Sequence, residues 1–141
     1  MKNKIIFLLC MVLSSCFAFD TEDMHIVDNI YVFCLDGVDE GQSLDRKDEK
    51  SFYYEIVEPM VYAIWNNDSI VIVKHHPLTG EHRKVNKDST DYYVVLIDKE
   101  CDERGFFQDS VIGPLNDKKL KKQVKVLGIK EKIKFKNVGF W

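Results

Sequence analysis

Short runs of apolar and aromatic residues, each about as long as one β-strand, constrain the fold of this chain more than any other feature. They cover residues 29–36, 52–57, 60–65, 70–76 and 92–97. Val, Ile, Tyr, Phe and Trp dominate these runs, and such residues favour strands. Asn67 and Asp68 lie between the third and fourth runs and suit a tight hairpin turn. The pattern predicts strands that pair in antiparallel fashion.

One segment near the C-terminus has a helical pattern instead. Leu120, Val124 and Leu127 are spaced by four and three residues and form a single apolar stripe, with most neighbouring lysines outside it. Asn116 is a suitable N-cap, and Gly128 suits the left-handed residue that follows many helices. We therefore expect one amphipathic helix from about 117 to about 127.

The remaining segments complete the expected architecture. Residues 38–50 are almost wholly polar and show no regular period, which predicts a long loop, and residues 77–91 predict a loop or an irregular hairpin. Residues 132–136 alternate lysine with apolar residues, which predicts a half-buried strand. The run 70–76 is apolar on both faces at its start and is expected at the centre of the sheet. The expected fold class is α+β: a single small domain with an antiparallel sheet of about five strands and one C-terminal amphipathic helix packed on it.

The N-terminus has the features of an export signal. Lys2 and Lys4 precede an apolar run that is too short to span a bilayer as a stable helix. The run ends in Leu-Ser-Ser-Cys at Cys16, which resembles the bacterial lipobox, where the cysteine is acylated and becomes the first residue of the mature protein. We expect a lipoprotein signal peptide at 1–15, a tether at 16–27 and a single domain at 28–141. Acyl chains such as palmitate on Cys16 would anchor that domain to the membrane.

This reading predicts a location in the bacterial cell envelope. An aspartate directly after the acylated cysteine resembles an inner-membrane retention signal. This chain has Phe17 at that position instead, so the outer membrane is favoured in a Gram-negative cell. Cleavage after Ala18 remains open, since small residues at 16 and 18 also satisfy ordinary signal peptidase, and it would leave a secreted or periplasmic protein. Export also argues against a nucleic-acid partner.

Two cysteines remain in the expected domain after either cleavage. Cys34 and Cys101 could form a disulfide, which is common in oxidising compartments. The alternative is that Cys34 is simply a small buried side chain within its apolar run. Both readings stay open, because sequence alone does not show whether the two Cα atoms approach within bonding range.

Charge is segregated along the chain although its formal net charge is only −3. Between Phe19 and Lys50 there are ten acidic and three basic residues, whereas from Asp117 to Trp141 there are two acidic and nine basic residues. The basic end could face anionic lipid, lipopolysaccharide or a partner. The simpler reading is that its lysines face water on an amphipathic helix.

Aromatic side chains are the leading candidates for a binding surface. Adjacent aromatic residues on a strand point to opposite faces of the sheet, so some rings must lie outside the core. Tyr and Trp are common interface anchors, although cross-strand ring packing alone would also explain them. The predicted binding residues are Tyr53, Tyr62, Trp65 and Tyr92.

The histidines do not predict a metal site. His75 and His76 are adjacent on an expected strand and so point to opposite faces, which makes joint ligation with His82 difficult. The chain contains no glycine-rich phosphate loop, nucleophile elbow or Cys-x-x-Cys pair. We expect no catalytic residue, no metal and no cofactor.

The order of several segments resembles a known family. The segments are 56–59, 65–71, 92–99 and 113–115, followed by a helix ending in Leu-Gly-Ile at 127–129. This order is similar to an uncharacterised family of small bacterial envelope lipoproteins, known chiefly as a domain of unknown function. The resemblance implies a small sheet with one helix in an exported lipoprotein, and it implies no catalytic residue. The charged segments 38–50 and 101–107 depart from the family pattern.

These observations favour an envelope-anchored, noncatalytic binding or interaction module. Its partners would be the membrane, through the lipid anchor, and an envelope protein or glycan, through the outward rings and the segment 38–50. Two alternatives remain: a small envelope hydrolase with a histidine and carboxylate pair, and an envelope inhibitor or immunity protein.

Overall fold

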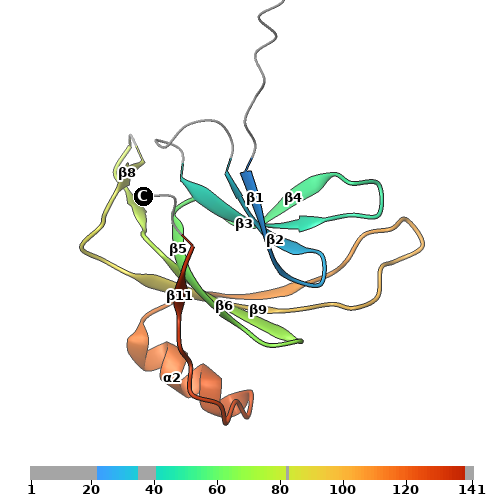
Figure 1. Cartoon of the computed structure of the whole chain (residues 1–141). Coiled ribbons are helices and arrows are strands. Elements are labelled where there is room, and N and C mark those ends of the chain that lie inside the picture. Colours follow the sequence, from blue (N-terminus) through green and yellow to red (C-terminus); the bar gives the residue numbers. More distant parts are fainter. Residues whose placement is uncertain (1–21, 35–40, 82, 139–141) are drawn as a thin grey trace, which may run out of the picture.

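Two antiparallel sheets stack face to face in the structure, a computed structural model that describes residues 22–34, 41–81 and 83–138 (Figure 1). The four-stranded sheet contains, in spatial order, β1 (Glu22–Val27), β2 (Ile30–Cys34), β3 (Gln42–Lys47) and β4 (Tyr53–Val57). The five-stranded sheet contains, in spatial order, β10 (Ser110–Leu115), β9 (Asp91–Leu96), β6 (Ile70–His75), β5 (Val61–Asn66) and β11 (Lys136–Asn137). A separate short hairpin is formed by β7 (Leu78–Thr79) and β8 (Lys84–Val85).

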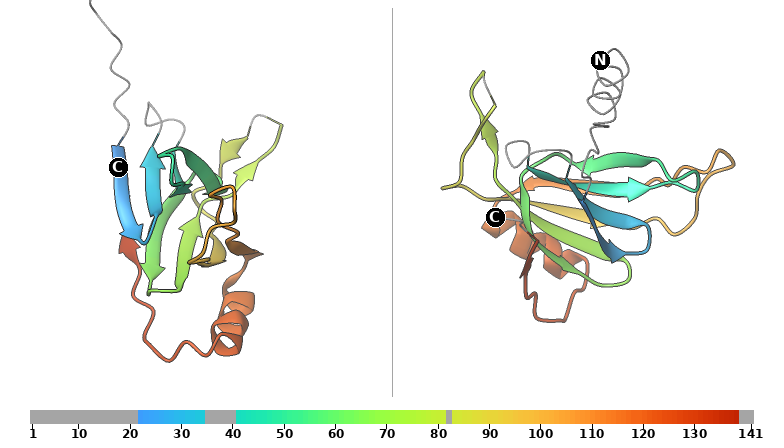
Figure 2. Two further views of the ribbon diagram at one scale, coloured as in Figure 1. Left: turned by 90° about the vertical axis from the view of Figure 1, so that its right-hand side faces the viewer. Right: turned by 45° about the horizontal axis from the view of Figure 1, so that its top comes forward.

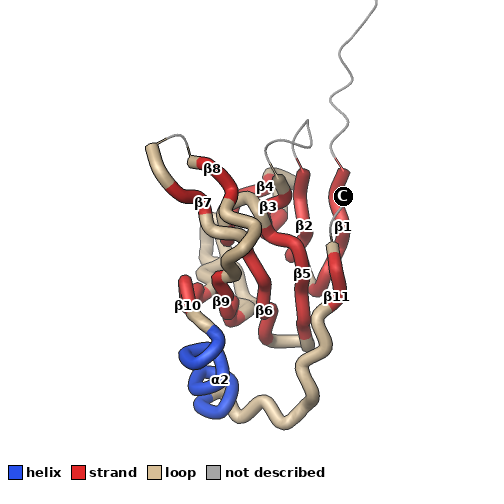
Figure 3. Tube along the Cα trace, turned by 90° about the vertical axis from the view of Figure 1, so that its left-hand side faces the viewer, coloured by secondary structure: helices blue, strands red, loops and turns tan. Residues whose placement is uncertain are grey.

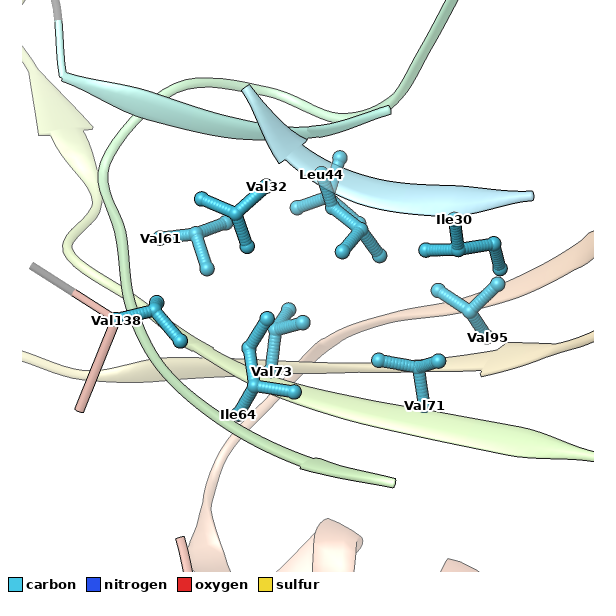
Figure 4. Packing of buried hydrophobic residues seen from close by; sticks show 10 residues of the cluster. Ile30, Val32, Leu44, Val61, Ile64, Val71, Val73, Val95 and Val138 are labelled. Atoms are coloured by element: carbon cyan, nitrogen blue, oxygen red, sulfur yellow. The ribbon is translucent and has the colours of Figure 1, made fainter. Parts of the chain in front are cut away.

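The main core lies between the two sheets (Figure 4). Ile30, Val32 and Leu44 point into it from the four-stranded sheet, and all three are fully buried. The five-stranded sheet faces them with Val61, Ile64, Val71, Val73 and Val95. Burying one such aliphatic side chain contributes about 1.5–3 kcal/mol, so this layer is the principal source of stability.

A second, smaller core lies on the other face of the five-stranded sheet, beneath helix α2 (Asp117–Val126). Ile72 and Val94 point toward the helix, whereas their strand neighbours Val71 and Val95 point toward the other sheet. Leu120 is the buried residue that α2 contributes to this layer. Strand β6 pairs with both β5 and β9, which confirms the predicted central strand with apolar cover on both faces.

Helix α2 confirms the predicted helix and both of its ends. The side chain of Asn116 accepts a hydrogen bond from the Lys119 backbone N–H at 2.9 Å, as an N-cap does. At the other end Gly128 has φ +67°, and the Ile129 N–H donates to the Val124 carbonyl at 3.1 Å. This is the Schellman arrangement, in which a left-handed residue lets the chain turn away from the helix. Among the described residues, no helix has the length and apolar character needed to cross a membrane.

The number of sheets corrects the sequence prediction. The structure has several antiparallel sheets rather than one sheet of about five strands, because β1 and β3 build a second layer that the sequence did not predict. Strand β1 occupies residues assigned to the tether at 16–27. Ile26 of that strand packs against the main core while His25 points outward, an alternation typical of a strand with one buried face.

Strand β3 lies inside the segment 38–50, which was predicted to be a loop. Its inward residues include the fully buried Arg46, whose guanidinium is paired rather than solvated. It donates hydrogen bonds to Asp109 Oδ1 at 2.8 Å, Asp28 Oδ2 at 3.0 Å and the Asp98 carbonyl oxygen at 2.7 Å. The ring of Phe107 covers it, with the guanidinium carbon 3.8 Å from the ring centroid. These distant partners make a charged residue compatible with a buried strand position.

The C-terminal strands also differ from the prediction. Strand β10 includes Gly113 and Pro114, yet it pairs with β9 through residues such as Val111 and Ile112. It is an edge strand, with a neighbouring strand on one side only. Proline is tolerated there because a residue whose N–H would point away from the neighbour needs no hydrogen-bond donor. Within the segment 132–136, which was expected to be a strand, only Lys136 belongs to one, β11. The apolar residues of that segment, Ile133 and Phe135, still pack against the second core.

Candidate functional site

The outer face of the four-stranded sheet carries a cluster of aromatic rings. Tyr31 and Phe33 alternate along β2 with the buried Ile30 and Val32, so their rings point away from the core. Register places His25 of β1 opposite Tyr31. The right-hand view of Figure 2 turns this sheet toward the reader, and no described helix or strand covers it. We define the aromatic face by the following residues of this surface: Asp23, His25, Tyr31, Phe33, Ser43, Asp45, Lys47, Tyr53 and Glu55.

The rings of this face contact one another across three strands. Phe33 and Tyr53 are stacked, with centroids 4.7 Å apart and planes at 21°. Tyr31 meets Tyr53 edge to face at 5.6 Å, and His25 meets Tyr31 in the same manner at 5.2 Å. Such pairs add about 0.5–1.5 kcal/mol beyond their area, so the rings form one ordered platform.

Charged groups surround the platform. The Tyr53 hydroxyl donates a hydrogen bond to Asp23 Oδ2, which raises the pKa of the tyrosine to about 12. The Lys47 ammonium lies 5.2 Å from the Tyr53 ring centroid and 5.8 Å from that of Tyr31, within the range of cation–π attraction. The face therefore combines ring surfaces with a carboxylate, Asp23, and an ammonium group, Lys47, at their edges.

Asp45 lies at the centre of the aromatic face. Its register partners are Tyr31 on β2 and Glu55 on β4, and it is only 6% exposed. Loss of hydration raises its pKa from 3.8 to about 6, a hydrogen bond with Ser43 lowers it, and the charge of Glu55 raises it. Its Oδ1 atom has no hydrogen-bond partner among the described residues. Asp45 is thus a poorly solvated carboxyl group beneath a surface of rings.

The four predicted aromatic residues do not form one surface. Tyr53 lies on the aromatic face, whereas Trp65 and Tyr92 are each 8% exposed and belong to the core beneath α2. Tyr62 stacks on His76 with centroids 4.1 Å apart, and its hydroxyl lies 2.7 Å from Thr90 Oγ1. Trp65 and Tyr92 therefore do not belong to the aromatic face.

Sequence reasoning missed three ring residues of the site. Tyr31 and Phe33 are two positions apart in one strand, which places both on the same face, and this signal was available in the sequence. His25 was missed because its segment was assigned to the tether.

Of the histidines in the hydrolase alternative, His75 is the one that lies near a carboxylate among the described residues, and its imidazole is buried. His75 is 1% exposed, and its Nε2 lies 2.8 Å from the Pro59 carbonyl oxygen and 3.9 Å from Glu58 Oε1. Burial lowers the pKa of His75. His76 contacts the Ser89 carbonyl oxygen at 2.9 Å. His82 lies outside the described residues, and no group of three His, Cys, Asp or Glu within the described part is placed to hold a metal ion.

No disulfide joins Cys34 and Cys101, both of which the structure describes. Cys34 pairs with Gln42 at the start of β3, whereas the Cys101 thiol donates to Glu49 Oε1 at 3.2 Å beyond the end of β3. The six residues of β3 separate these positions by roughly 20 Å, far more than the distance a disulfide spans. Of the two readings that the sequence left open for these cysteines, the structure does not show the disulfide. Cys16 and the signal peptide lie outside the described residues.

Comparison with known proteins identifies a family but no function. The family described as "Protein of unknown function (DUF3997)" matches residues 31–139, which include most of the two sheets and α2. Searches of curated proteins and of solved structures found no match.

Proposed function

The chain belongs to the DUF3997 family of proteins of unknown function, and we propose that it is an envelope-anchored, noncatalytic module that binds an envelope glycan through its aromatic face. The anchor would be lipid on Cys16, as the lipobox-like sequence suggests. The observation that carries the proposal is the platform of Tyr31, Phe33 and Tyr53 on the outer face of the four-stranded sheet, which no described helix or strand covers.

The chemistry of the aromatic face favours a polyhydroxylated ligand. Its rings are partly buried and surrounded by hydrogen-bonding groups, so it offers little continuous apolar area for a protein core contact. Tyrosine rings present an apolar face and a polar edge, which suits the C–H faces and hydroxyls of a sugar. Carboxylates at Asp23 and Glu55 accept hydrogen bonds, and the Lys47 ammonium donates them.

Cosedimentation with purified peptidoglycan and with cell-surface polysaccharide tests the proposal. The probe protein is the mature chain with Cys16→Ser, which removes the acylated residue. Tyr31→Ala and Phe33→Ala should each reduce the bound fraction severalfold, because each removes one ring of the platform. Tyr62→Ala is the matched control, since it removes a ring that lies off the aromatic face.

The anchor is tested separately in cells. Cys16→Ser should move the protein from the membrane fraction to the soluble fraction and abolish labelling by radioactive palmitate. An unchanged membrane fraction would contradict anchoring but leave glycan binding open to the sedimentation test. Binding that survives both ring variants, or binding to a protein alone, would contradict the glycan proposal.

A second candidate is an inhibitor that inserts two loops into a partner enzyme. Phe52 and Phe106 are 69% and 48% exposed, on the β3–β4 turn and on the β9–β10 loop. Residues of both loops line a common cavity of about 470 Å³, so the two loops lie side by side. Loss of a partner contact on Phe52→Ala with Phe106→Ala, with glycan binding unchanged, would favour this candidate.

A further inference from the structure

A second surface, separate from the aromatic face, lies against helix α2. In Figure 3, α2 lies at one end of the five-stranded sheet, and the segment after the helix runs back toward β11. A cavity of about 410 Å³ opens between these elements. Residues from β6, β9, α2 and the segment after α2 line it: Lys74, Tyr92, Asp117, Leu120, Lys121, Val124, Lys125, Ile133 and Phe135. We call this cavity the helix groove.

The floor of the helix groove is apolar. Leu120 and Val124 form the inward stripe of α2, and Ile133 and Phe135 approach from the returning segment. Leu120 is buried, but the other three side chains remain partly exposed. Apolar side chains that stay partly wet at the bottom of a groove gain free energy when an apolar ligand covers them.

The rim of the same groove is positively charged. The Lys74 ammonium lies 4.6 Å from the centroid of Phe135 and 6.0 Å from that of Tyr92, and Lys121 and Lys125 line the helix side. Asp117 is the one carboxylate of the lining, and its Oδ1 already accepts a hydrogen bond from the Tyr92 hydroxyl at 2.8 Å. The groove is therefore lined by three positively charged ammonium groups and one carboxylate, which is already hydrogen-bonded, and this excess of positive charge attracts an anion.

We propose that the helix groove binds a free single-chain amphiphile with an anionic head group, such as a medium-chain fatty acid. Its chain would cover the apolar floor, and its carboxylate would lie among Lys74, Lys121 and Lys125. A small inorganic anion would leave the floor wet, and an uncharged chain would leave the three ammonium groups without a counter-charge. The cavity volume falls within the range of about 300–1,000 Å³ that small-molecule sites occupy.

Fluorescence titration with dansylaminoundecanoic acid tests the proposal on the mature chain carrying Cys16→Ser. The probe is used below its critical micelle concentration, so that it binds as a monomer. We expect saturable binding and displacement by laurate, with much weaker displacement by dodecanol, which has the same chain but no charge. Lys121→Glu with Lys125→Glu should weaken binding by about tenfold, which corresponds to 1.4 kcal/mol.

Helix α2 offers a matched control. Lys118→Glu with Lys122→Glu makes the same change of charge on the same helix, at exposed positions that do not line the groove. This pair should change affinity by less than about twofold, because only screened long-range charge is altered. All four lysines are exposed, so both variants should keep the fold, which circular dichroism checks.

Three results would overturn the proposal. The first is the absence of saturable binding by the monomeric probe. The second is an equal loss of affinity in the two lysine pairs, which would indicate a general attraction to the basic end of the chain. The third is binding to vesicles of anionic phospholipid with no binding of free laurate, which would assign the surface to a membrane.

Discussion

Replacing Asp45 by asparagine should stabilise the protein at neutral and alkaline pH. Its carboxyl has a pKa of about 6 in the folded protein against 3.8 as the ordinary value, chiefly because burial disfavours the charged form. A difference of about two pKa units corresponds to about 3 kcal/mol. Above pH 6 the folded wild type bears this full penalty, because Asp45 is charged in both states. Asp45→Asn removes the charge, so its gain should approach about 3 kcal/mol at pH 8.

The direction in which stability changes with pH is specific to an acidic group whose pKa is raised in the folded protein. Below the ordinary pKa the carboxyl is protonated in both states, so wild type and variant should be equally stable near pH 3. As pH rises from 4 to 6, the unfolded chain loses its proton first, and the wild type loses stability relative to Asp45→Asn. The gain should therefore appear between about pH 4 and pH 6.

Urea denaturation at a series of pH values measures this difference. Glu55→Gln is the control, since its exposed side chain is the register partner of Asp45 and its removal should change stability by at most about 0.5 kcal/mol. Equal stability of Asp45→Asn and wild type at pH 8, or a difference that does not vary with pH, would refute the reasoning.

Three further substitutions test the packing, each by urea denaturation at pH 7. Arg46→Ala should cost about 3–5 kcal/mol, because it leaves the buried Asp109 carboxylate without its guanidinium, and a loss below 1 kcal/mol would contradict the buried ion pair. Leu44→Ala should cost about 2–5 kcal/mol through a cavity between the sheets, whereas the exposed Val126→Ala should be nearly neutral. Asn116→Ala should cost about 1 kcal/mol by removing the N-cap of α2; no change would show that the cap contributes little.

Local sequence patterns predicted the strands and the helix whose buried faces consist of apolar side chains. Strand β6, strand β9 and helix α2 agree with the sequence because their apolar periodicity matches what they bury. The cap at Asn116 and the turn at Gly128 were predictable for the same reason, since both depend on residues within a few positions along the chain.

Strand β3 was not predictable by the same reasoning. Its residues Gln42 and Arg46 point inward but are polar, and Arg46 is stabilised by Asp28 and Asp109, which lie 18 and 63 positions away. A single sequence does not show such long-range pairs, so the segment resembled a loop. Missing β3 also removed the second sheet from the expected fold.

The candidate site was predicted only in part. Of the predicted rings, Tyr53 lies on the outward face of the four-stranded sheet with Tyr31 and Phe33, whereas Trp65 and Tyr92 lie beneath α2. The sequence predicted the helix but did not show which face of the sheet the helix covers. The covered face determines which aromatic rings are buried. The alternation of Tyr31 and Phe33 could have identified their common face once β2 was taken as a strand with one buried side.

The most direct test of the aromatic face is a binding isotherm for the envelope polysaccharide retained best in sedimentation, measured with Tyr31→Ala beside Tyr62→Ala. Both variants lose one tyrosine ring, but only the first lies on the platform with Tyr53. Glycan binding at this face predicts a severalfold weaker affinity for Tyr31→Ala and a wild-type affinity for Tyr62→Ala. Equal affinities in the two variants would contradict it.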